Sequence, residues 1–230
     1  DAALWDEESP NLYQVRVILM EGEKLVDEQS VVTGILLLDW NAEKGMVVNG
    51  KSVKLRGGCI HHDNGILGAC APYAAEYRKA KILKRAGFNA IRSAHNPISK
   101  EMLAACDELG IYVMDEAFDQ WQFPKLDYDY ALYFDKEWEK DCLAMILKDR
   151  NHPSVIMYSI GNEIGDTGKA SGQEISHRLS HFFHKHDATR PTTNGINPTV
   201  SAMGGTPGAK NVTESDVVDP SEESAGSQAT

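Results

Sequence analysis

Apolar and polar positions alternate with two different periods along this chain. Between Asn11 and Thr33 the period is short: Leu12–Leu19 alternates loosely, Glu21–Lys24 is polar with a glycine, and Leu25–Val32 runs back. Two such runs around a polar turn predict a β-hairpin. A two-stranded sheet alone is only marginally stable in water, so we expect the hairpin to belong to a larger sheet whose other strands precede residue 1.

From about Val47 to Ile196, short apolar runs alternate with amphipathic stretches of helical length. The apolar runs are Val53–Ile60, Asn89–Ser93, Ile111–Met114, Val155–Ile160 and Thr192–Ile196. The expected helices between them are Ala74–Ala86, Lys100–Leu109, Lys136–Lys148 and Gly172–His186. This alternation predicts a parallel α/β sheet, and the nearly continuous apolar runs indicate strands that are covered on both faces.

The residues from about Pro198 to Thr230 are rich in Gly, Ser, Thr, Pro and acidic residues and show no apolar period. Such a composition predicts loop or disorder rather than a packed element. We therefore expect three zones: a hairpin that ends a sheet domain over 1–35, a strand–helix domain over 36–197, and a polar acidic tail over 198–230.

Composition excludes several classes of partner. The 34 acidic and 23 basic residues give a formal net charge of −11, which argues against nucleic acid because phosphate binding needs a basic face. The four cysteines lie far apart without a C-x-x-C pair and predict buried apolar side chains. No run approaches the roughly 20 apolar residues of a membrane span, so we expect no membrane partner. The first residues lack a signal peptide, but the chain is expected to begin inside a domain, so cytoplasmic and periplasmic locations both stay open.

Ionisable and hydrogen-bonding side chains gather where the predicted strands end. The first four runs end in His61-His62-Asp63, in Arg92 with His95 and Asn96 beyond it, in Asp115-Glu116, and in Asn162-Glu163. In a (β/α)8 barrel, as in a doubly wound sheet, the carboxyl ends of the strands carry the active site. No Gly-x-Gly-x-x-Gly or Walker-type loop follows any of these runs, so the sequence does not indicate a nucleotide-binding site. The pattern predicts one functional face.

Several of these residues also have a structural interpretation. His61 and His62 could simply hydrogen-bond loop backbone, and together with Asp63 they could bind a metal ion. Arg92 could simply neutralise Asp115 or Glu116 on the neighbouring strand, so those two acids stay open between a structural and a functional role. Trp121, in the loop after the third strand, could lie in the core or stack on a sugar face.

Glu163 differs from these residues because it ends an apolar strand directly after Gly161-Asn162. Burial at such a position would favour the protonated form of the carboxyl group. A protonated carboxyl group is what a general acid needs in order to donate to a glycosidic oxygen. The position of Glu163 therefore predicts a catalytic acid.

Two longer motifs resemble the signatures of glycoside hydrolase family 2. Residues 89–97, Asn-Ala-Ile-Arg-Ser-Ala-His-Asn-Pro, look like the first signature, and residues 149–163, which end in Gly-Asn-Glu, look like the second. The loops His61–Gly68 and Asp115–Trp121 resemble the β-galactosidase versions of those loops, and residues 49–58 resemble the entry into the family's barrel. The resemblance covers residues 4–197.

The resemblance implies an α/β fold, an incomplete (β/α)8 TIM barrel preceded by the last strands of an immunoglobulin-like β-sandwich. It implies retaining hydrolysis of terminal β-D-galactosides; β-glucuronidase, β-mannosidase or a non-catalytic carbohydrate-binding remnant are the alternatives. Glu163 would be the general acid/base, and Asn162 would hydrogen-bond the sugar 2-hydroxyl. The other residues expected to bind the terminal sugar are His61, Asp63, Arg92 and His95, with Asp115, Glu116 and Trp121 as further candidates.

Two departures from the family pattern limit these expectations. Gln120 and Gln122 stand where metal-dependent relatives carry Glu and His, so we expect no metal and no other cofactor. The family's nucleophilic Glu lies on the seventh barrel strand, whereas no apolar strand precedes Glu214, Glu222 or Glu223. We therefore expect this chain alone to be an inactive fragment with exposed strand edges, which would favour self-association into a homo-oligomer.

Overall fold

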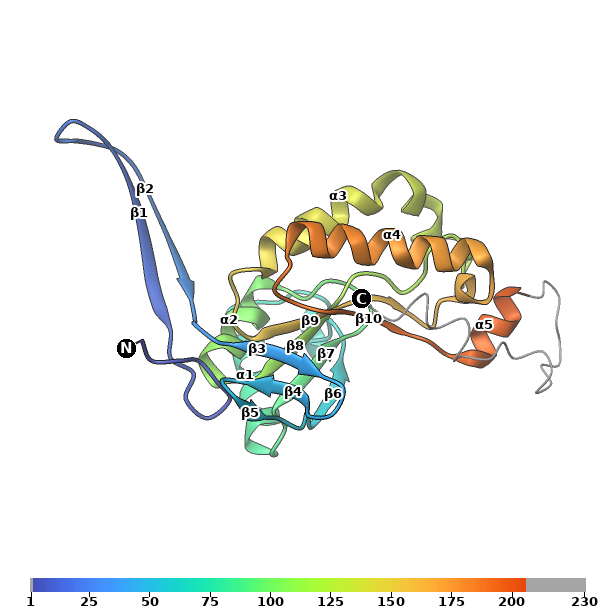
Figure 1. The fold of residues 1–230 in the computed structure, drawn as a ribbon, viewed down its shortest axis with the longest axis horizontal. Helices are drawn as coiled ribbons and strands as arrows, with labels where there is room; N and C mark the ends of the chain where they lie inside the picture. Colours follow the sequence, from blue (N-terminus) through green and yellow to red (C-terminus); the bar gives the residue numbers. More distant parts are fainter. Residues whose placement is uncertain (1, 206–230) are drawn as a thin grey trace.

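Five parallel strands form the central sheet of the structure, a computed structural model that describes residues 2–205 (Figure 1). Most of the predicted tail, including Glu214, Glu222 and Glu223, lies outside the described residues. The strands are adjacent in the order in which they occur along the chain. They are β6 (Gly57–Ile60), β7 (Ala90–Ser93), β8 (Tyr112–Glu116), β9 (Val155–Asn162) and β10 (Thr192–Gly195).

A helix connects each of these strands to the next. The four helices are α1 (Tyr73–Arg85), α2 (Lys100–Leu109), α3 (Ala131–Asp149) and α4 (Ala170–His186). Parallel neighbours need a crossover connection, which a helix supplies. The sheet order and the helices confirm the α/β class and correspond to part of a (β/α)8 barrel. None of the helices in residues 2–205 is both long and apolar enough to cross a membrane.

An apolar cluster lies on each face of this sheet. The larger cluster, between the sheet and the helices, includes Ile91 and Val113. The smaller cluster, on the other face, includes Ala90 and Tyr112 together with Trp5 from the start of the chain. Side chains alternate between the two faces along a strand, so sequence neighbours such as Ala90 and Ile91 enter different clusters. This two-sided burial explains why the strands read as nearly continuous apolar runs.

A small antiparallel sheet, which the sequence analysis did not identify, contributes to the smaller cluster. Its strands are β3 (Leu38–Asn41), β4 (Gly45–Val48) and β5 (Lys51–Ser52), and Met46 and Val48 are buried in the cluster. Asn49 and Gly50 form the turn between β4 and β5, with φ values of 52° and 80°. An Asn-Gly pair is a strong hairpin signal because both residues tolerate positive φ, so the sequence did contain this information.

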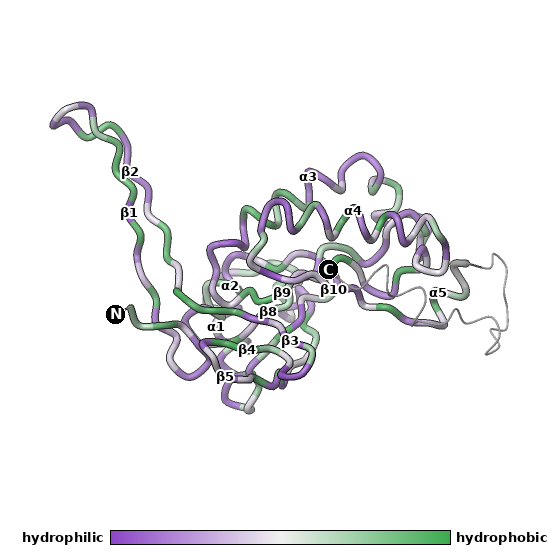
Figure 2. The backbone as a smooth tube through the Cα atoms, in the orientation of Figure 1, coloured by the Kyte–Doolittle hydropathy of each residue, from purple (hydrophilic) through white to green (hydrophobic). Residues whose placement is uncertain are grey.

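The predicted N-terminal hairpin is present and projects away from the rest of the chain (Figure 1). β1 (Tyr13–Glu21) pairs with β2 (Lys24–Thr33) in antiparallel register. Apolar segments occur along both strands (Figure 2), and side chains such as Val17, Leu19 and Val26 are exposed. Exposed apolar side chains on a two-stranded ribbon are typical of strands that pack against a larger sheet.

Two helices differ from the predictions by more than two residues. α3 begins at Ala131 rather than at Lys136, and Asp129 Oδ1 accepts a hydrogen bond from the Ala131 backbone N–H at 3.0 Å. Pro198–Gly205 forms helix α5, although a loop was predicted there. The side-chain oxygen of Asn197 accepts from the N–H groups of the first turn, and Pro198 is the first helical residue. An asparagine cap and a proline at the first helical position are both signals of a helix start, but the polar composition of the segment hid them from the sequence analysis. Two short 3-10 helices, Gly65–Leu67 and Gly165–Gly168, complete the described structure.

Candidate active site

Glu116, the last residue of β8, is the centre of a hydrogen-bond network at the carboxyl ends of the strands. Its side chain is fully buried. Its Oε2 accepts hydrogen bonds from Arg92 Nε (2.9 Å), from Arg92 Nη2 (2.6 Å) and from Ser159 Oγ (2.6 Å). Its Oε1 lies 2.6 Å from Nδ1 of His95. A carboxylate removed from water needs partners of this kind, and here they tie β7 and β9 to β8.

The alternation of side chains along the strands explains why these groups meet. Arg92 is in register with Met114, two residues before Glu116, and Glu116 is in register with Ser159. Residues two apart on a strand point to the same face of the sheet. Arg92, Glu116 and Ser159 therefore share the face that points away from the helices.

The network continues from Arg92 through Asn162 to Asp119 and Lys125. Arg92 Nη2 donates to Asn162 Oδ1 at 2.8 Å, and Asn162 Nδ2 donates to Asp119 Oδ1 at 2.8 Å. Because an arginine can only donate and a carboxylate only accepts, the orientation of the Asn162 amide is fixed. Lys125 Nζ donates to the same Asp119 oxygen at 2.6 Å and to the backbone carbonyl oxygen of Asn162 at 2.8 Å.

Paired charges and hydrogen bonds affect the pKa values of Arg92 and Asp119 more than burial does. Burial alone would lower the pKa of Arg92, but the hydrogen bonds and the charge of Glu116 raise it above its ordinary value. Burial alone would raise the pKa of Asp119, but hydrogen bonds from Lys125 and Asn162 lower it. Both side chains are therefore charged at neutral pH.

Glu163 follows β9 directly, with its backbone in the left-handed region at φ 47°. For a residue other than glycine this conformation costs about 1–3 kcal/mol and persists only where the surroundings hold it. The Glu163 N–H donates to the carbonyl oxygen of Gly195 at 2.6 Å, and its Oε1 accepts from Asn197 Nδ2 at 3.0 Å. The Glu163 residue is exposed, so the predicted burial is wrong for the described residues. The reason is that β10, the neighbouring strand, is the edge of the described sheet.

His61 lies beside the network, whereas Asp63 does not join it. The ring of His61 packs edge-on against the ring of His95, with the centroids 5.6 Å apart. Asp63 Oδ1 instead accepts a hydrogen bond from the backbone N–H of Gly65 at 2.9 Å and so stabilises its own loop. The structure thus brings together His61, Arg92, His95, Glu116 and Asn162, with Glu163 adjacent.

Two predicted sugar-binding residues, Asp115 and Trp121, prove to be structural. Asp115 is fully buried and accepts from Lys148 Nζ of α3 at 3.1 Å, because it points to the helix side of β8. Trp121 is fully buried as well, and its indole N–H donates to the carbonyl oxygen of Ile160 at 2.9 Å. Neither side chain is accessible to a sugar, so the functional interpretation of both is wrong.

The sequence analysis missed three members of the network, namely Asp119, Lys125 and Ser159. Asp119 lies within the loop motif that resembles β-galactosidases, so that motif could have identified it. Ser159 lies inside an apolar run and looked like an ordinary strand residue. Lys125 is a single basic residue in a polar loop, and no local pattern distinguishes it from a solvated lysine.

Gln120 and Gln122, which stand where metal-dependent relatives have ligands, are engaged by other partners. The amide of Gln120 is buried, and its hydrogen-bond partners fix which atom is the oxygen and which the nitrogen. In that orientation the oxygen accepts from the Tyr130 N–H at 2.8 Å, and the nitrogen donates to Asp119 Oδ2 at 3.3 Å. Gln122 Nε2 donates to Asp135 Oδ1 at 2.6 Å. Within residues 2–205, no three His, Cys, Asp or Glu side chains are arranged to hold a metal ion.

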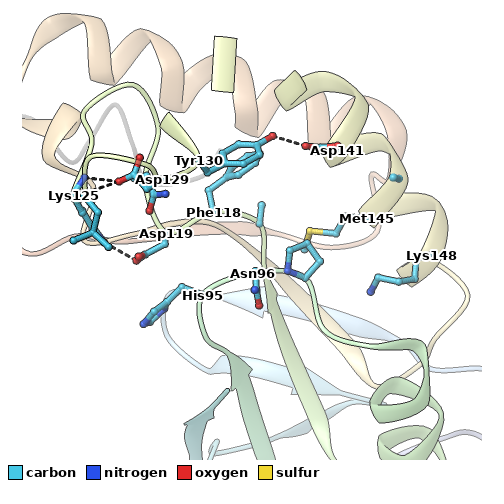
Figure 3. A pocket seen from close by; sticks show the side chains of 15 residues that line it. His95, Asn96, Phe118, Asp119, Lys125, Asp129, Tyr130, Asp141, Met145 and Lys148 are labelled. Atoms are coloured by element: carbon cyan, nitrogen blue, oxygen red, sulfur yellow. Dashed lines mark hydrogen bonds and ion pairs between the residues drawn. The ribbon is translucent and has the colours of Figure 1, made fainter. Parts of the chain in front are cut away.

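A pocket of about 620 Å³ opens beside the network (Figure 3). Its lining includes His95, Asp119 and Lys125 from the network, and it reaches Met145 on α3. Tyr130 stacks on Phe118 at its wall, with the ring centroids 5.2 Å apart. Arg92, Glu116, Asn162 and Glu163 do not line this pocket, which extends along α3 instead, so it is distinct from the space in which those four side chains meet.

Two family models match the chain. The model described as "Glycosyl hydrolases family 2, TIM barrel domain" matches residues 39–206. A second, described as "Glycosyl hydrolases family 2", matches residues 1–35.

Individual relatives agree with these matches. The β-galactosidase BoGH2A of Bacteroides ovatus is 46% identical over 161 residues, which are 70% of this chain and 19% of that protein. A solved glycosyl hydrolase family 2 member from Bacteroides cellulosilyticus is 49% identical with a TM-score of 0.84, over 88% of this chain and 26% of its own. A solved β-D-glucuronidase of Dictyoglomus thermophilum is 27% identical with a TM-score of 0.73, over 84% of this chain and 34% of its own. The chain thus spans about a fifth of the curated relative and a quarter to a third of the two structures.

Gln120 and Gln122 predict that the enzyme does not need a divalent metal ion. Two neutral amides that are already hydrogen-bonded are poor ligands for Mg²⁺, so hydrolysis of glycosides by the product of the complete reading frame should not depend on a divalent cation. Treatment with EDTA, followed by addition of Mg²⁺, checks this by initial rates. The rate should be unchanged in both steps, and a large loss that Mg²⁺ restores would contradict the prediction.

Proposed function

Because the chain belongs to glycoside hydrolase family 2, we propose that it supplies the acid/base half of an active site for the retaining hydrolysis of terminal β-D-galactosides. One observation carries the proposal. Asn162 is the last residue of β9 and Glu163 follows it directly, and Arg92, itself paired with Glu116, holds the Asn162 amide. Such an arrangement provides an ionisable group next to fixed hydrogen-bonding groups, as a glycosidase needs.

The proposed sugar site uses the residues on the inner face of the strand ends. A pyranose presents several hydroxyl groups, and imidazole, amide and guanidinium groups offer donors and acceptors in fixed directions. In this proposal Asn162 binds the 2-hydroxyl, and His61, His95 and Arg92 line the remainder of the subsite. Hydrogen bonds that shorten as the ring becomes oxocarbenium-like would lower the barrier. Asp63 stays a weaker candidate because its carboxylate already accepts from loop backbone.

Glu163 would act first as an acid and then as a base. Its proton would go to the glycosidic oxygen while a nucleophilic carboxylate attacks the anomeric carbon, and water activated by the Glu163 carboxylate would then release the sugar. Within residues 2–205, Glu116 is unsuitable as the nucleophile because it is fully buried and accepts from three side chains. We therefore propose that the nucleophile comes from a later barrel strand than β10.

The galactoside specificity is supported by loop residues and by the named relative. The segments His61–Gly68 and Asp115–Trp121 resemble the β-galactosidase versions, and a β-galactosidase is 46% identical to this chain. A uronate-specific enzyme is the main rival, since one structural relative is a β-D-glucuronidase. β-Mannosidase and a non-catalytic carbohydrate-binding protein are further alternatives, and turnover separates the latter from an enzyme.

For the proposed function, the first prediction concerns the reaction of the complete gene product. We expect release of terminal galactose from nitrophenyl β-D-galactoside, with the β-anomer as the first product, because two inversions restore the configuration. Proton NMR of the anomeric signals during the first minutes measures this. Initial α-galactose, or turnover of the glucuronide alone, would contradict the proposal, and bound galactose without any turnover would favour the binding protein.

A second prediction concerns Glu163 and the leaving group. Glu163→Ala in the complete enzyme should lower kcat/KM for an alkyl β-galactoside by about 10²–10⁴-fold, because general acid catalysis is worth that much for a poor leaving group. A dinitrophenyl galactoside needs little protonation, so its glycosylation rate should fall far less. Steady-state kinetics with a series of leaving groups measures the difference.

Azide completes this test. Once Glu163 is removed, the glycosyl-enzyme lacks a base for water, and azide, which needs no base, should restore turnover and give a β-glycosyl azide. Glu174→Ala, an exposed glutamate on α4, serves as the matched control and should behave like the wild type. Equal losses for good and poor leaving groups, with no azide product, would assign Glu163 a structural role instead.

A further inference from the structure

Lys125, in the loop between β8 and α3, makes two hydrogen bonds that nothing in the proposed reaction has yet used. Its ammonium group donates to Asp119 Oδ1 at 2.6 Å and to the backbone carbonyl oxygen of Asn162 at 2.8 Å. That carbonyl belongs to the peptide group between Asn162 and Glu163. Lys125 thus contacts the backbone that carries the proposed acid/base rather than its carboxyl group.

The backbone around this peptide group is held from three directions. The Asn162 N–H donates to the Phe118 carbonyl oxygen at 3.0 Å, and the Glu163 N–H donates to the Gly195 carbonyl oxygen at 2.6 Å. The Asn162 carbonyl accepts from Lys125. Two of these three partners are backbone groups of neighbouring segments, which a mutation cannot remove. Lys125 is the one that a substitution can delete.

We infer that Lys125 is a positioning residue that holds the Asn162–Glu163 peptide in the orientation that acid catalysis requires. The inference rests on the proposed role of Glu163. Glu163 has φ 47°, and such a conformation in a residue other than glycine persists only where several contacts determine it. Without the ammonium group, the Asn162 carbonyl loses its side-chain donor, and this peptide group is held less firmly, with its N–H still bonded to Gly195. A displacement of about 1 Å at a catalytic group can cost about 10²-fold in rate.

The positive charge of Lys125 contributes to this positioning as well as its hydrogen bond to the Asn162 carbonyl. Asp119 accepts from both Lys125 and Asn162, so its carboxylate lies between an ammonium group and the amide that orients toward Arg92. A neutral side chain at position 125 leaves that carboxylate without its counter-ion, 2.8 Å from the Asn162 amide. Arginine keeps the charge and the donors, whereas methionine fills similar space and offers neither.

A double-mutant cycle tests this inference. Lys125→Met, Glu163→Ala and the double variant are made in the enzyme expressed from its complete reading frame. The readout is kcat/KM for the nitrophenyl β-glycoside that the wild type hydrolyses best, together with the thermal unfolding midpoint of each variant. Lys140→Met, an exposed lysine on α3, is the control and should retain the wild-type rate.

The expected result is a loss of about 10–100-fold for Lys125→Met, and no further loss when it is added to Glu163→Ala, because both changes remove the same function. Lys125→Arg should retain most of the rate. The loss for Lys125→Met should also grow as the leaving group becomes poorer, which a general loss of stability would not produce. If the methionine variant does not fold, Lys125→Gln, which keeps a donor but no charge, replaces it in the cycle.

Three outcomes overturn the inference, and all of them differ from a failure of the proposed function. A Lys125→Met loss that multiplies with that of Glu163→Ala, or one that is equal for all leaving groups, assigns Lys125 to sugar binding or to folding. A wild-type rate for Lys125→Met removes its role altogether. If Glu163→Ala itself causes no loss that depends on the leaving group, then it is the proposed function that has failed.

Discussion

The ion pair between Glu116 and Arg92 is the interaction on which the rest of the site depends. Glu116 is fully buried on β8, and the guanidinium group of Arg92 on β7 reaches its Oε2 at 2.6 Å. A carboxylate in such a place is costly without partners, and removal of one partner of a buried pair commonly costs several kcal/mol. Arg92, His95 and Ser159 all converge on Glu116, and Arg92 then orients the Asn162 amide. Glu116 thus holds in place the groups that we propose bind the sugar.

Asp115 and Glu116 are consecutive acids with opposite roles, and the period of the strand separates them. Asp115 points toward α3 and meets Lys148, where it helps to raise the pKa of that lysine, although burial alone would lower it. Glu116 points to the opposite face and meets Arg92. Because side chains alternate along the strand, one of these neighbouring acids pairs with a helix and the other pairs with Arg92 in the proposed active site. Both acids are buried, so burial alone does not reveal which one is functional.

Much of the fold followed from the sequence, because strand–helix alternation and apolar runs are local signals. The five parallel strands, the four connecting helices and the N-terminal hairpin occur where the patterns predicted them. The meeting of polar side chains at the strand ends also followed from local signals, since polar residues ended four of the predicted strands. The roles of Asp115 and Glu116 did not follow, because they depend on the register between β7 and β8, which the sequence leaves open. Trp121 and Lys125 stayed ambiguous for a related reason: their partners, Ile160 and the Asn162 carbonyl, are backbone groups of a strand more than 30 residues away.

The most direct measurement compares Glu116→Gln with Asp115→Asn in the complete enzyme. Each variant replaces a buried carboxylate with an amide of the same shape, so both should lower the unfolding midpoint. The account predicts that only Glu116→Gln also lowers kcat/KM per folded molecule, by about 10–100-fold, since a hydrogen bond to a charged group contributes about 1.5–3 kcal/mol. The loss should be present even for a dinitrophenyl glycoside, because the proposed role of Glu116 is to position the sugar-binding groups rather than to protonate the leaving group. A folded Glu116→Gln enzyme with the wild-type rate, or equal losses for the two variants, would contradict the account.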